Sequence, residues 1–189
     1  RFLDGGAVHG CGEFHPFTVS GLGPDGTLRV AIKALGDCTR MLQRMAPGLL
    51  VRLQGPFGRF LHEDPGEDGG ADDGRPAPSA RPALWVAGGI GITPFIAELR
   101  ERPRRAVPTT LLYLHRTPAD AVFADELAAI AEADPRFTLQ ALATGDALPD
   151  LDRLLDTVPD LAGRRVHACG PAALVAALRA RLQARGVPD

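Results

Sequence analysis

The stretch Trp85-Val86-Ala87-Gly88-Gly89-Ile90-Gly91-Ile92-Thr93-Pro94-Phe95 decides the fold of this chain. An apolar strand, Ala83–Ala87, runs into a glycine turn, and a helix is expected to begin with Thr93 as N-cap and Pro94 as first helical residue. Glycines let a backbone turn tightly and approach a ligand, and a helix N-terminus attracts phosphate. The stretch predicts a dinucleotide-binding turn, although Pro94 replaces the third glycine of the G-x-G-x-x-G fingerprint. A simple packing turn between strand and helix is the alternative.

The rest of residues 83–189 alternates strands with helices, which is typical of a parallel sheet with crossover helices. We expect strands at Ala83–Ala87, Thr109–His115, Phe137–Leu142 and Val166–Cys169, and helices at Pro94–Arg102, Ala121–Ala133, Asp150–Thr157 and Pro171–Arg185. This half of the chain is therefore predicted to be an α/β domain.

Residues 1–61 have a different pattern, in which apolar and polar residues alternate as in half-buried strands. Strands are expected at Phe14–Ser20, Leu28–Lys33 and Leu49–Gln54, with a loop over 4–12 and a short helix from Asp37 as N-cap to about Arg44. So few strands cannot close a barrel, so we interpret this region as part of an antiparallel barrel.

Residues 62–82 are rich in glycine, proline and acidic residues and contain no large apolar residue. Such a composition cannot bury a core, and it predicts a disordered linker or insertion.

Charge and composition exclude several classes of function. The net charge of −2 carries no signal for a nucleic-acid partner. No run approaches about 18 apolar residues, so these residues are not expected to span a membrane. The three cysteines and five histidines show no metal-ligand spacing, and no metal site is predicted. Because the chain begins at Arg1, we expect it to be a piece of a longer polypeptide.

Five short motifs follow one another in an order that is more specific than any one of them. They are His15-Pro16-Phe17-Thr18, Gly36-Asp37-Cys38-Thr39, Gly55-Pro56-Phe57-Gly58, Gly88–Pro94 and Cys169-Gly170-Pro171. In this order the chain resembles the ferredoxin–NADP reductase superfamily, and more narrowly the flavin and nicotinamide region of the ferric reductase and NADPH oxidase-like family. The resemblance implies three segments: the C-terminal part of an FAD-binding barrel (1–61), the linker (62–82), and an NAD(P)-binding α/β domain without its extreme C-terminus (83–189).

The resemblance also implies a flavin site. His15 would contact the phosphates of FAD, Phe17 would stack on the flavin, and Thr18 would hydrogen-bond near flavin N5 as a candidate catalytic residue. The turn from Gly36 would bind the pyrophosphate, with the Asp37 carboxylate pointing away. The implied FAD-binding residues are His15, Pro16, Phe17, Thr18, Gly36, Cys38 and Thr39.

A nicotinamide site is implied in the second half. Cys169 would lie against the nicotinamide and align it for hydride transfer, although a small buried residue before a helix is the plain alternative. The implied residues are Gly88, Gly89, Gly91, Thr93, Pro94, Cys169, Gly170 and Pro171. Arg116, at the end of the second strand, offers a charge to the 2′-phosphate of NADPH, so NADPH is favoured over NADH. Nearby Asp120 is an argument against this preference, and a solvated arginine is the alternative.

These features lead to an enzyme hypothesis and two alternatives. In the main one, NAD(P)H gives a hydride to FAD, which passes single electrons to a haem, metal or oxygen acceptor. The chain would then be the cytoplasmic dehydrogenase part of a ferric reductase or NADPH oxidase-like membrane protein, with a haem-bearing transmembrane domain upstream. The alternatives are a soluble reductase component that serves a ferredoxin or oxygenase partner, and a non-catalytic NAD(P)-sensing module.

Overall fold

The computed structural model describes residues 2–4, 7–9, 14–58, 60–61 and 81–187, with the backbone alone for 2–4 and 7–9. The expected linker at 62–82 lies outside the described residues except for its last two positions. Its predicted disorder therefore stays a prediction.

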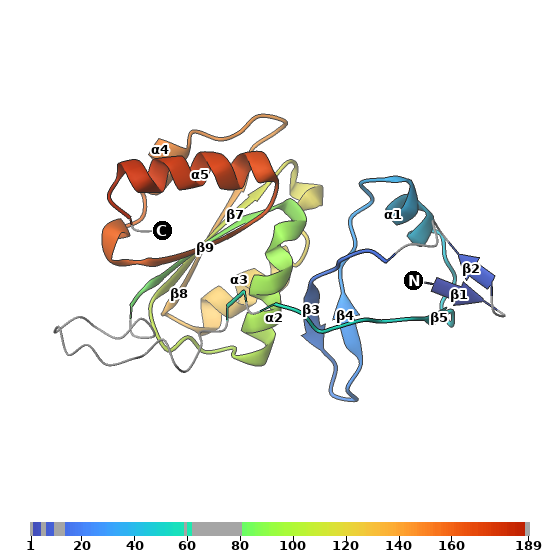
Figure 1. Cartoon of the computed structure of the whole chain (residues 1–189). Helices are drawn as coiled ribbons and strands as arrows, with labels where there is room; N and C mark the ends of the chain where they lie inside the picture. The colour runs from blue at the N-terminus through green and yellow to red at the C-terminus, as the bar shows by residue number, and fades with distance from the viewer. Residues whose placement is uncertain (1, 5–6, 10–13, 59, 62–80, 188–189) are drawn as a thin grey trace.

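Four strands between residues 83 and 169 form a parallel sheet in the order β8-β7-β6-β9, seen edge-on in Figure 1. The strands are β6 (Ala83–Gly88), β7 (Thr109–His115), β8 (Phe137–Ala143) and β9 (Arg165–Cys169). Every residue of β6 and β7 is buried. Parallel strands covered on both faces read as continuous apolar runs, which is why the sequence located these strands to within a residue.

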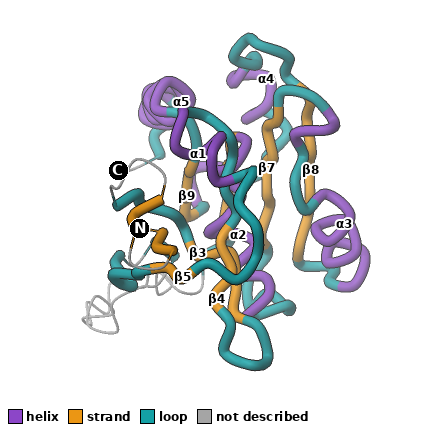
Figure 2. Tube along the Cα trace, turned by 90° about the vertical axis from the view of Figure 1, so that its right-hand side faces the viewer, coloured by secondary structure: helices purple, strands orange, loops and turns teal. Residues whose placement is uncertain are grey.

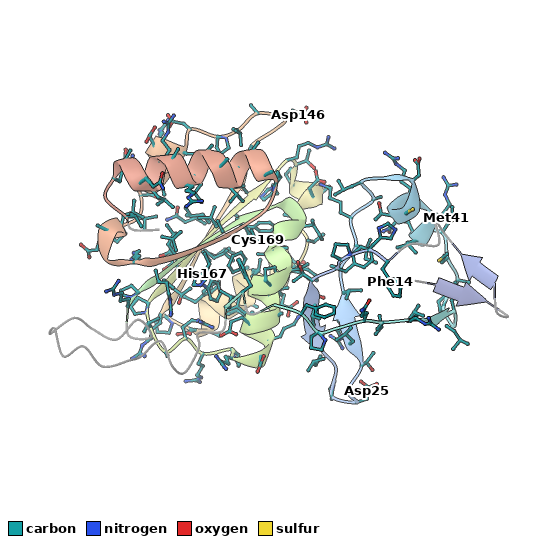
Figure 3. The ribbon with its side chains drawn as sticks, viewed as in Figure 1. Phe14, Asp25, Met41, Asp146, His167 and Cys169 are labelled. Atoms are coloured by element: carbon teal, nitrogen blue, oxygen red, sulfur yellow. The ribbon has the colours of Figure 1, made fainter. Side chains whose placement is uncertain are left out.

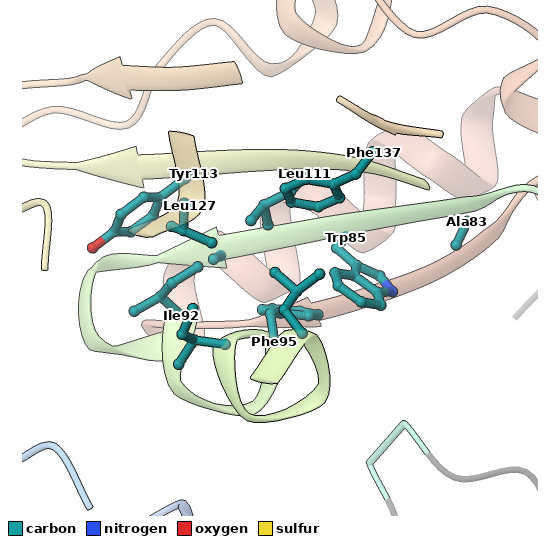
Figure 4. Close-up of a cluster of buried hydrophobic side chains, with 11 residues drawn as sticks. Ala83, Trp85, Ile92, Phe95, Leu111, Tyr113, Leu127 and Phe137 are labelled. Carbon is teal, nitrogen blue, oxygen red and sulfur yellow. The ribbon is translucent and has the colours of Figure 1, made fainter. Parts of the chain in front are cut away.

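Helices cover both faces of the parallel sheet, and two separate cores result. On one face, α2 (Thr93–Glu101) and α3 (Ala124–Ala133) cover a cluster in which Trp85 stacks on Phe95 with ring centroids 5.1 Å apart (Figure 4). On the other face, α4 (Leu151–Leu155) and α5 (Ala172–Ala184) cover an aliphatic cluster. The α/β prediction is confirmed.

The helix expected from Ala121 begins later, at Ala124. Residues Pro118–Asp120 form a separate 3-10 turn, and Phe123, the N-cap of α3, has the left-handed backbone angle φ 64°. A left-handed residue breaks the helical hydrogen-bond pattern, and the periodicity of apolar residues does not reveal it.

The N-terminal half contains two small antiparallel sheets and one helix. β3 (Val19–Leu22) pairs with β4 (Leu28–Val30), and β1 (Phe2–Asp4) lies between β2 (Ala7–His9) and β5 (Leu50–Val51). The helix α1 covers Asp37–Leu42, with Gly36 rather than Asp37 as its N-cap.

The sequence expectations are less accurate in this half. Residues 14–18 are not part of a strand; they precede β3, and Pro16 has no N–H to give to a ladder. The loop expected over 4–12 contains β2, and the strand expected at 49–54 is only two residues long. These elements are short, so their pairing depends on distant partners more than on local pattern.

The two halves meet where β3 packs along α2, as two views of the molecule agree (Figures 1 and 2). Within the described ranges, no helix is long and apolar enough to cross a membrane.

Candidate functional site

Two of the predicted motifs meet at the carboxyl end of the sheet. The chain builds β6, β7 and β8 outward in one direction and then returns to place β9 on the free side of β6. In the register of this pair, Ala87 lies opposite Cys169. The turn after β6 and the Cys169–Pro171 motif after β9 are therefore neighbours at the point where the strand order reverses. Open α/β sheets bind their ligands at this position.

Glycines allow these two turns to approach each other closely. A Cβ on Gly91 would lie 2.2 Å from the carbonyl oxygen of Cys169, and one on Gly88 would lie 2.6 Å from Cδ2 of Leu174. A Cβ on Gly170 would in turn lie 3.0 Å from Cα of Gly88. Close packing of the two turns therefore accounts for these three glycines, and their role in binding a nucleotide stays a prediction.

Gly89 is different, because it faces open space. Its φ is +55°, and no atom lies within 4 Å of the Cβ position. It starts a 3-10 turn, Gly89–Ile92, that leads into α2. Thr93 is the first residue of α2 and not its N-cap, which is Ile92; the Thr93 hydroxyl donates to the carbonyl of Ile90 at 3.1 Å. The open side of Gly89, beside the N-terminus of α2, fits the approach of a phosphate.

Cys169 ends β9 as a free, half-buried thiol that packs against the aromatic core cluster (Figure 3). Burial raises the pKa of this thiol above its usual value. The side chain is therefore a neutral thiol near pH 7, which suits a shaping contact and does not suit a nucleophilic role.

His167 is a notable residue that the sequence analysis missed. It lies two residues before Cys169, and so on the same face of β9, with its ring edge-on to Phe60 at a centroid distance of 5.8 Å. Its Nδ1 atom is buried without a hydrogen-bond partner among the described residues. Burial, aided by the charge of Arg165, lowers the pKa of His167 to about 4. The alternation of residues along the strand could have revealed it.

This histidine is expected to weaken the fold in mild acid. The ordinary pKa of histidine is 6.5, and in the folded protein that of His167 is about 4. At a pH between these two values the unfolded chain binds a proton at this residue and the folded chain does not. The free energy of unfolding therefore falls as the pH falls from 6.5 to about 4. We expect the free energy of unfolding of His167→Gln to fall by about 1–2 kcal/mol less than that of the wild type over this pH range, after allowing for the partial exposure of the His167 ring. Urea unfolding of the full-length protein at pH 7 and pH 4.5 measures it; equal losses in both proteins would contradict the assignment.

The predicted flavin residues lie in the extended segment directly before β3. The rings of His15 and Phe17 are neighbours, with centroids 6.3 Å apart and planes tilted by 44°. Thr18 between this pair and β3 is exposed. The segment thus presents two rings and a hydroxyl, as the motif predicts, and their contacts with a flavin stay a prediction.

The turn from Gly36 to Thr39 is held together by its own threonine. The Thr39 hydroxyl oxygen accepts the backbone N–H groups of Leu35 and Gly36, each at 2.9 Å. The Asp37 side chain is fully exposed and pairs with Arg40 at 3.1 Å. The carboxylate therefore points to solvent, as expected, and Thr39 shapes the turn.

Arg116 has two acidic neighbours. Its guanidinium lies 3.6 Å from a carboxylate oxygen of Asp120 and 3.5 Å from one of Asp146. Asp120 also accepts the Thr117 hydroxyl at 2.7 Å and pairs with Lys33 of the N-terminal half at 3.2 Å. The Thr117 hydrogen bond and then Lys33 lower the pKa of Asp120 to about 2. Asp146 was not foreseen, because α3 and β8 separate it from Arg116 in the sequence.

The described residues contain no group of three or more His, Cys, Asp or Glu side chains that could hold a metal ion. At this edge of the sheet lie two closely packed glycine turns, the N-terminus of α2 and the neutral thiol of Cys169. Gly89, which has a left-handed backbone, faces open space beside them. These groups fit a phosphate-bearing nucleotide.

No family model matches the chain. Over 148 residues it is 35% identical to an NADPH oxidoreductase of Mycobacterium tuberculosis, covering 75% of this chain and 36% of the relative. Over 102 residues it is 41% identical to a carnitine monooxygenase reductase subunit of Escherichia coli, covering 54% and 30%. The chain thus spans about a third of the length of these relatives.

The fold is similar to a solved ferredoxin NADP+ reductase from Neisseria gonorrhoeae with bound FAD and NADP. The TM-score is 0.61 and the sequence identity 21%, and the match covers 90% of this chain and 72% of the other.

Proposed function

Because the chain belongs to the ferredoxin–NADP reductase-like superfamily of FAD- and NAD(P)-binding proteins, we propose that it is the flavin and nicotinamide part of an electron-transfer reductase. This reductase takes a hydride from NAD(P)H onto FAD and passes electrons to an oxygenase or a small acceptor protein. The observation that carries the proposal is the contact between the Gly88–Thr93 turn and Cys169–Pro171 at the switch point of the sheet.

The E. coli relative, named as the reductase subunit of a monooxygenase, supports this reductase component. From the sequence alone, a soluble reductase component was the alternative, and the main hypothesis was a ferric reductase or NADPH oxidase-like protein with an upstream haem domain. The relatives above support the alternative better than that first reading. Residues 1–61 are proposed as the flavin side and residues 83–189 as the nicotinamide side.

The residues of the chain would bind and orient the two cofactors. Bound FAD supplies the step from two-electron hydride transfer to one-electron transfer. Backbone N–H groups at the start of α2, beside the open Gly89, are proposed to hold the nicotinamide pyrophosphate. Cys169 would limit the space for the nicotinamide ring with an uncharged thiol, while Phe17 and the Thr18 hydroxyl would contact the flavin.

The test of this proposal is anaerobic reduction of the full-length protein. It is expected to purify with FAD, to lose flavin absorbance when NADPH or NADH is added, and then to reduce a one-electron acceptor such as cytochrome c. A full-length protein that contains no FAD, or whose FAD keeps its absorbance with both nucleotides, would reject the proposed function.

Cofactor preference is expected to depend on Arg116. A 2′-phosphate carries more charge than the exposed Asp146 carboxylate and would displace it from the guanidinium, since an exposed ion pair is weak. We expect Arg116→Ala to raise the KM for NADPH by roughly 10- to 150-fold, which corresponds to about 1.5–3 kcal/mol for a charged hydrogen bond. The KM for NADH should change less than about 2-fold. Steady-state kinetics with both nucleotides measure the difference.

Two variants sharpen the interpretation. Asp146→Asn removes the competing carboxylate, so NADPH should bind more tightly. Arg153→Ala removes an exposed arginine on α4 as the matched control and should change neither KM. If Arg116→Ala changes the KM values for NADPH and NADH equally, Arg116 does not hold the 2′-phosphate.

A further inference from the structure

Arg100, one residue before the C-terminal end of α2, joins three segments that are distant in sequence. Its Nε and Nη2 atoms donate to the two carboxylate oxygens of Glu126 on α3, each at 2.7 Å. Its Nη1 donates to the backbone carbonyl of Ser20 in β3 at 2.6 Å. One guanidinium thus connects two helices of the nicotinamide half to a strand of the flavin half.

The carbonyl of Ser20 is available because β3 contains a bulge. In the β3–β4 ladder, Val19 pairs with Val30 and Gly21 pairs with Arg29, so Ser20 is skipped. A bulged residue is left out of the ladder and its polar groups are aimed elsewhere. Here the carbonyl accepts a charged donor instead of a strand partner.

The surroundings of Arg100 keep its side chain in one place. Only 21% of the side chain is exposed, and its guanidinium carbon lies 4.8 Å from the centre of the Phe123 ring. A Cβ on Gly21, where φ is +154°, would lie 3.1 Å from Cδ of Arg100. The Glu126 hydrogen bonds, above all, raise the pKa of Arg100, so its charge is permanent. A forked, partly buried contact of this kind is stronger than a surface ion pair.

We propose that Arg100 is a positioning residue that sets the nicotinamide half against the flavin half, an inference that rests on the proposed function. Ser20 follows Thr18 of the flavin motif by two residues, and α2 begins at the nicotinamide turn. A shift at this contact therefore changes the separation of the two bound rings. A misplacement of about 1 Å in such a pair can cost on the order of 10²-fold in rate.

The pair Lys33–Asp120 is a second contact across the same junction, at 3.2 Å. It lies beside Arg116 and joins Lys33, which follows β4 (Leu28–Val30), so it does not fix the position of β3 by itself. Loss of Arg100 is therefore expected to loosen the junction without separating the halves.

The experiment uses the full-length protein loaded with FAD and three variants. Arg100→Ala removes the contact, Arg100→Lys keeps the charge but cannot bridge Glu126 and Ser20 as a fork, and Arg102→Gln is the control. Arg102 lies next to the end of α2, where it pairs with Glu98 of the same helix at 3.5 Å. Stopped-flow absorbance gives the limiting rate of reduction per bound flavin and the Kd of the nucleotide, and amide hydrogen exchange reports on β3.

Arg100→Ala is expected to lower the limiting rate by roughly 10- to 100-fold, with FAD content and nucleotide Kd within about 2-fold of wild type and faster exchange in β3. The limiting rate of Arg100→Lys should lie between those of Arg100→Ala and the wild type, and the rate of Arg102→Gln should equal the wild-type rate. If Arg100→Ala and Arg100→Lys both keep the wild-type rate per bound flavin, the positioning role is rejected, whatever their stability. If wild-type FAD itself is not reduced, the proposed function fails and this inference falls with it.

Discussion

Replacing Gly91 with alanine is expected to lower the free energy of unfolding of the full-length protein by about 2–4 kcal/mol and to abolish tight NAD(P)H binding. The new methyl group would lie 2.2 Å from the carbonyl oxygen of Cys169 and 2.8 Å from the amide nitrogen of Gly170. Both are backbone atoms, which cannot move aside as the end of a side chain can. The two turns must separate, so the fold and the proposed nicotinamide site are damaged together. Urea unfolding and nucleotide titration measure the two effects.

Two further glycines provide the controls. Gly163→Ala adds the same methyl group in open space at an ordinary backbone angle, and it should change the free energy of unfolding by less than about 1 kcal/mol. Gly89→Ala is also free of clashes, but its left-handed backbone makes it cost about 1–2 kcal/mol. A Gly91→Ala protein as stable as the Gly163→Ala protein would mean that the turns do not approach as closely as the structure shows.

Replacing Cys169 with alanine is expected to slow reduction of the bound flavin by on the order of 10²-fold while FAD content stays nearly unchanged. The thiol ends β9 opposite Ala87 and beside the glycine turn, where its volume would limit the movement of a nicotinamide ring. Alanine leaves that space empty and leaves the ring poorly aligned. Stopped-flow loss of flavin absorbance at saturating NAD(P)H measures the rate.

Cys169→Ser tests whether the space filled by the side chain or the ionisation of the thiol matters for the rate of flavin reduction. Serine keeps a side-chain heavy atom close to the position of the sulfur, although it is smaller, so its rate should lie above that of Cys169→Ala. Because burial raises the pKa of the thiol, the wild-type rate should show no step from Cys169 ionisation between pH 6 and 8.5. An unchanged rate in Cys169→Ala, with only a lower thermal stability, would leave this cysteine a packing residue.

Much of the parallel sheet could be predicted from local sequence. β6 and β7 are runs of apolar residues that end in glycine or polar residues, and both faces of such strands must be covered. In the N-terminal half the same reasoning was weaker, because β5 has two residues and residues 14–18 are extended without being in a strand. Short strands gain their stability from partners across the sheet, and a local pattern does not name the partner.

By itself, the sequence determined the α/β half, the order of its strands along the chain, the glycine turn after β6 and the Cys169 motif after β9. Only the tertiary structure decided that these two turns touch, that Asp120 and Asp146 surround Arg116, that the Nδ1 atom of His167 is buried, and that Arg100 joins β3 to α2. Apolar periodicity records which face of an element is buried within a few residues. Contacts between residues far apart in the sequence arise from strand order and bulges, which depend on how whole elements pack against one another.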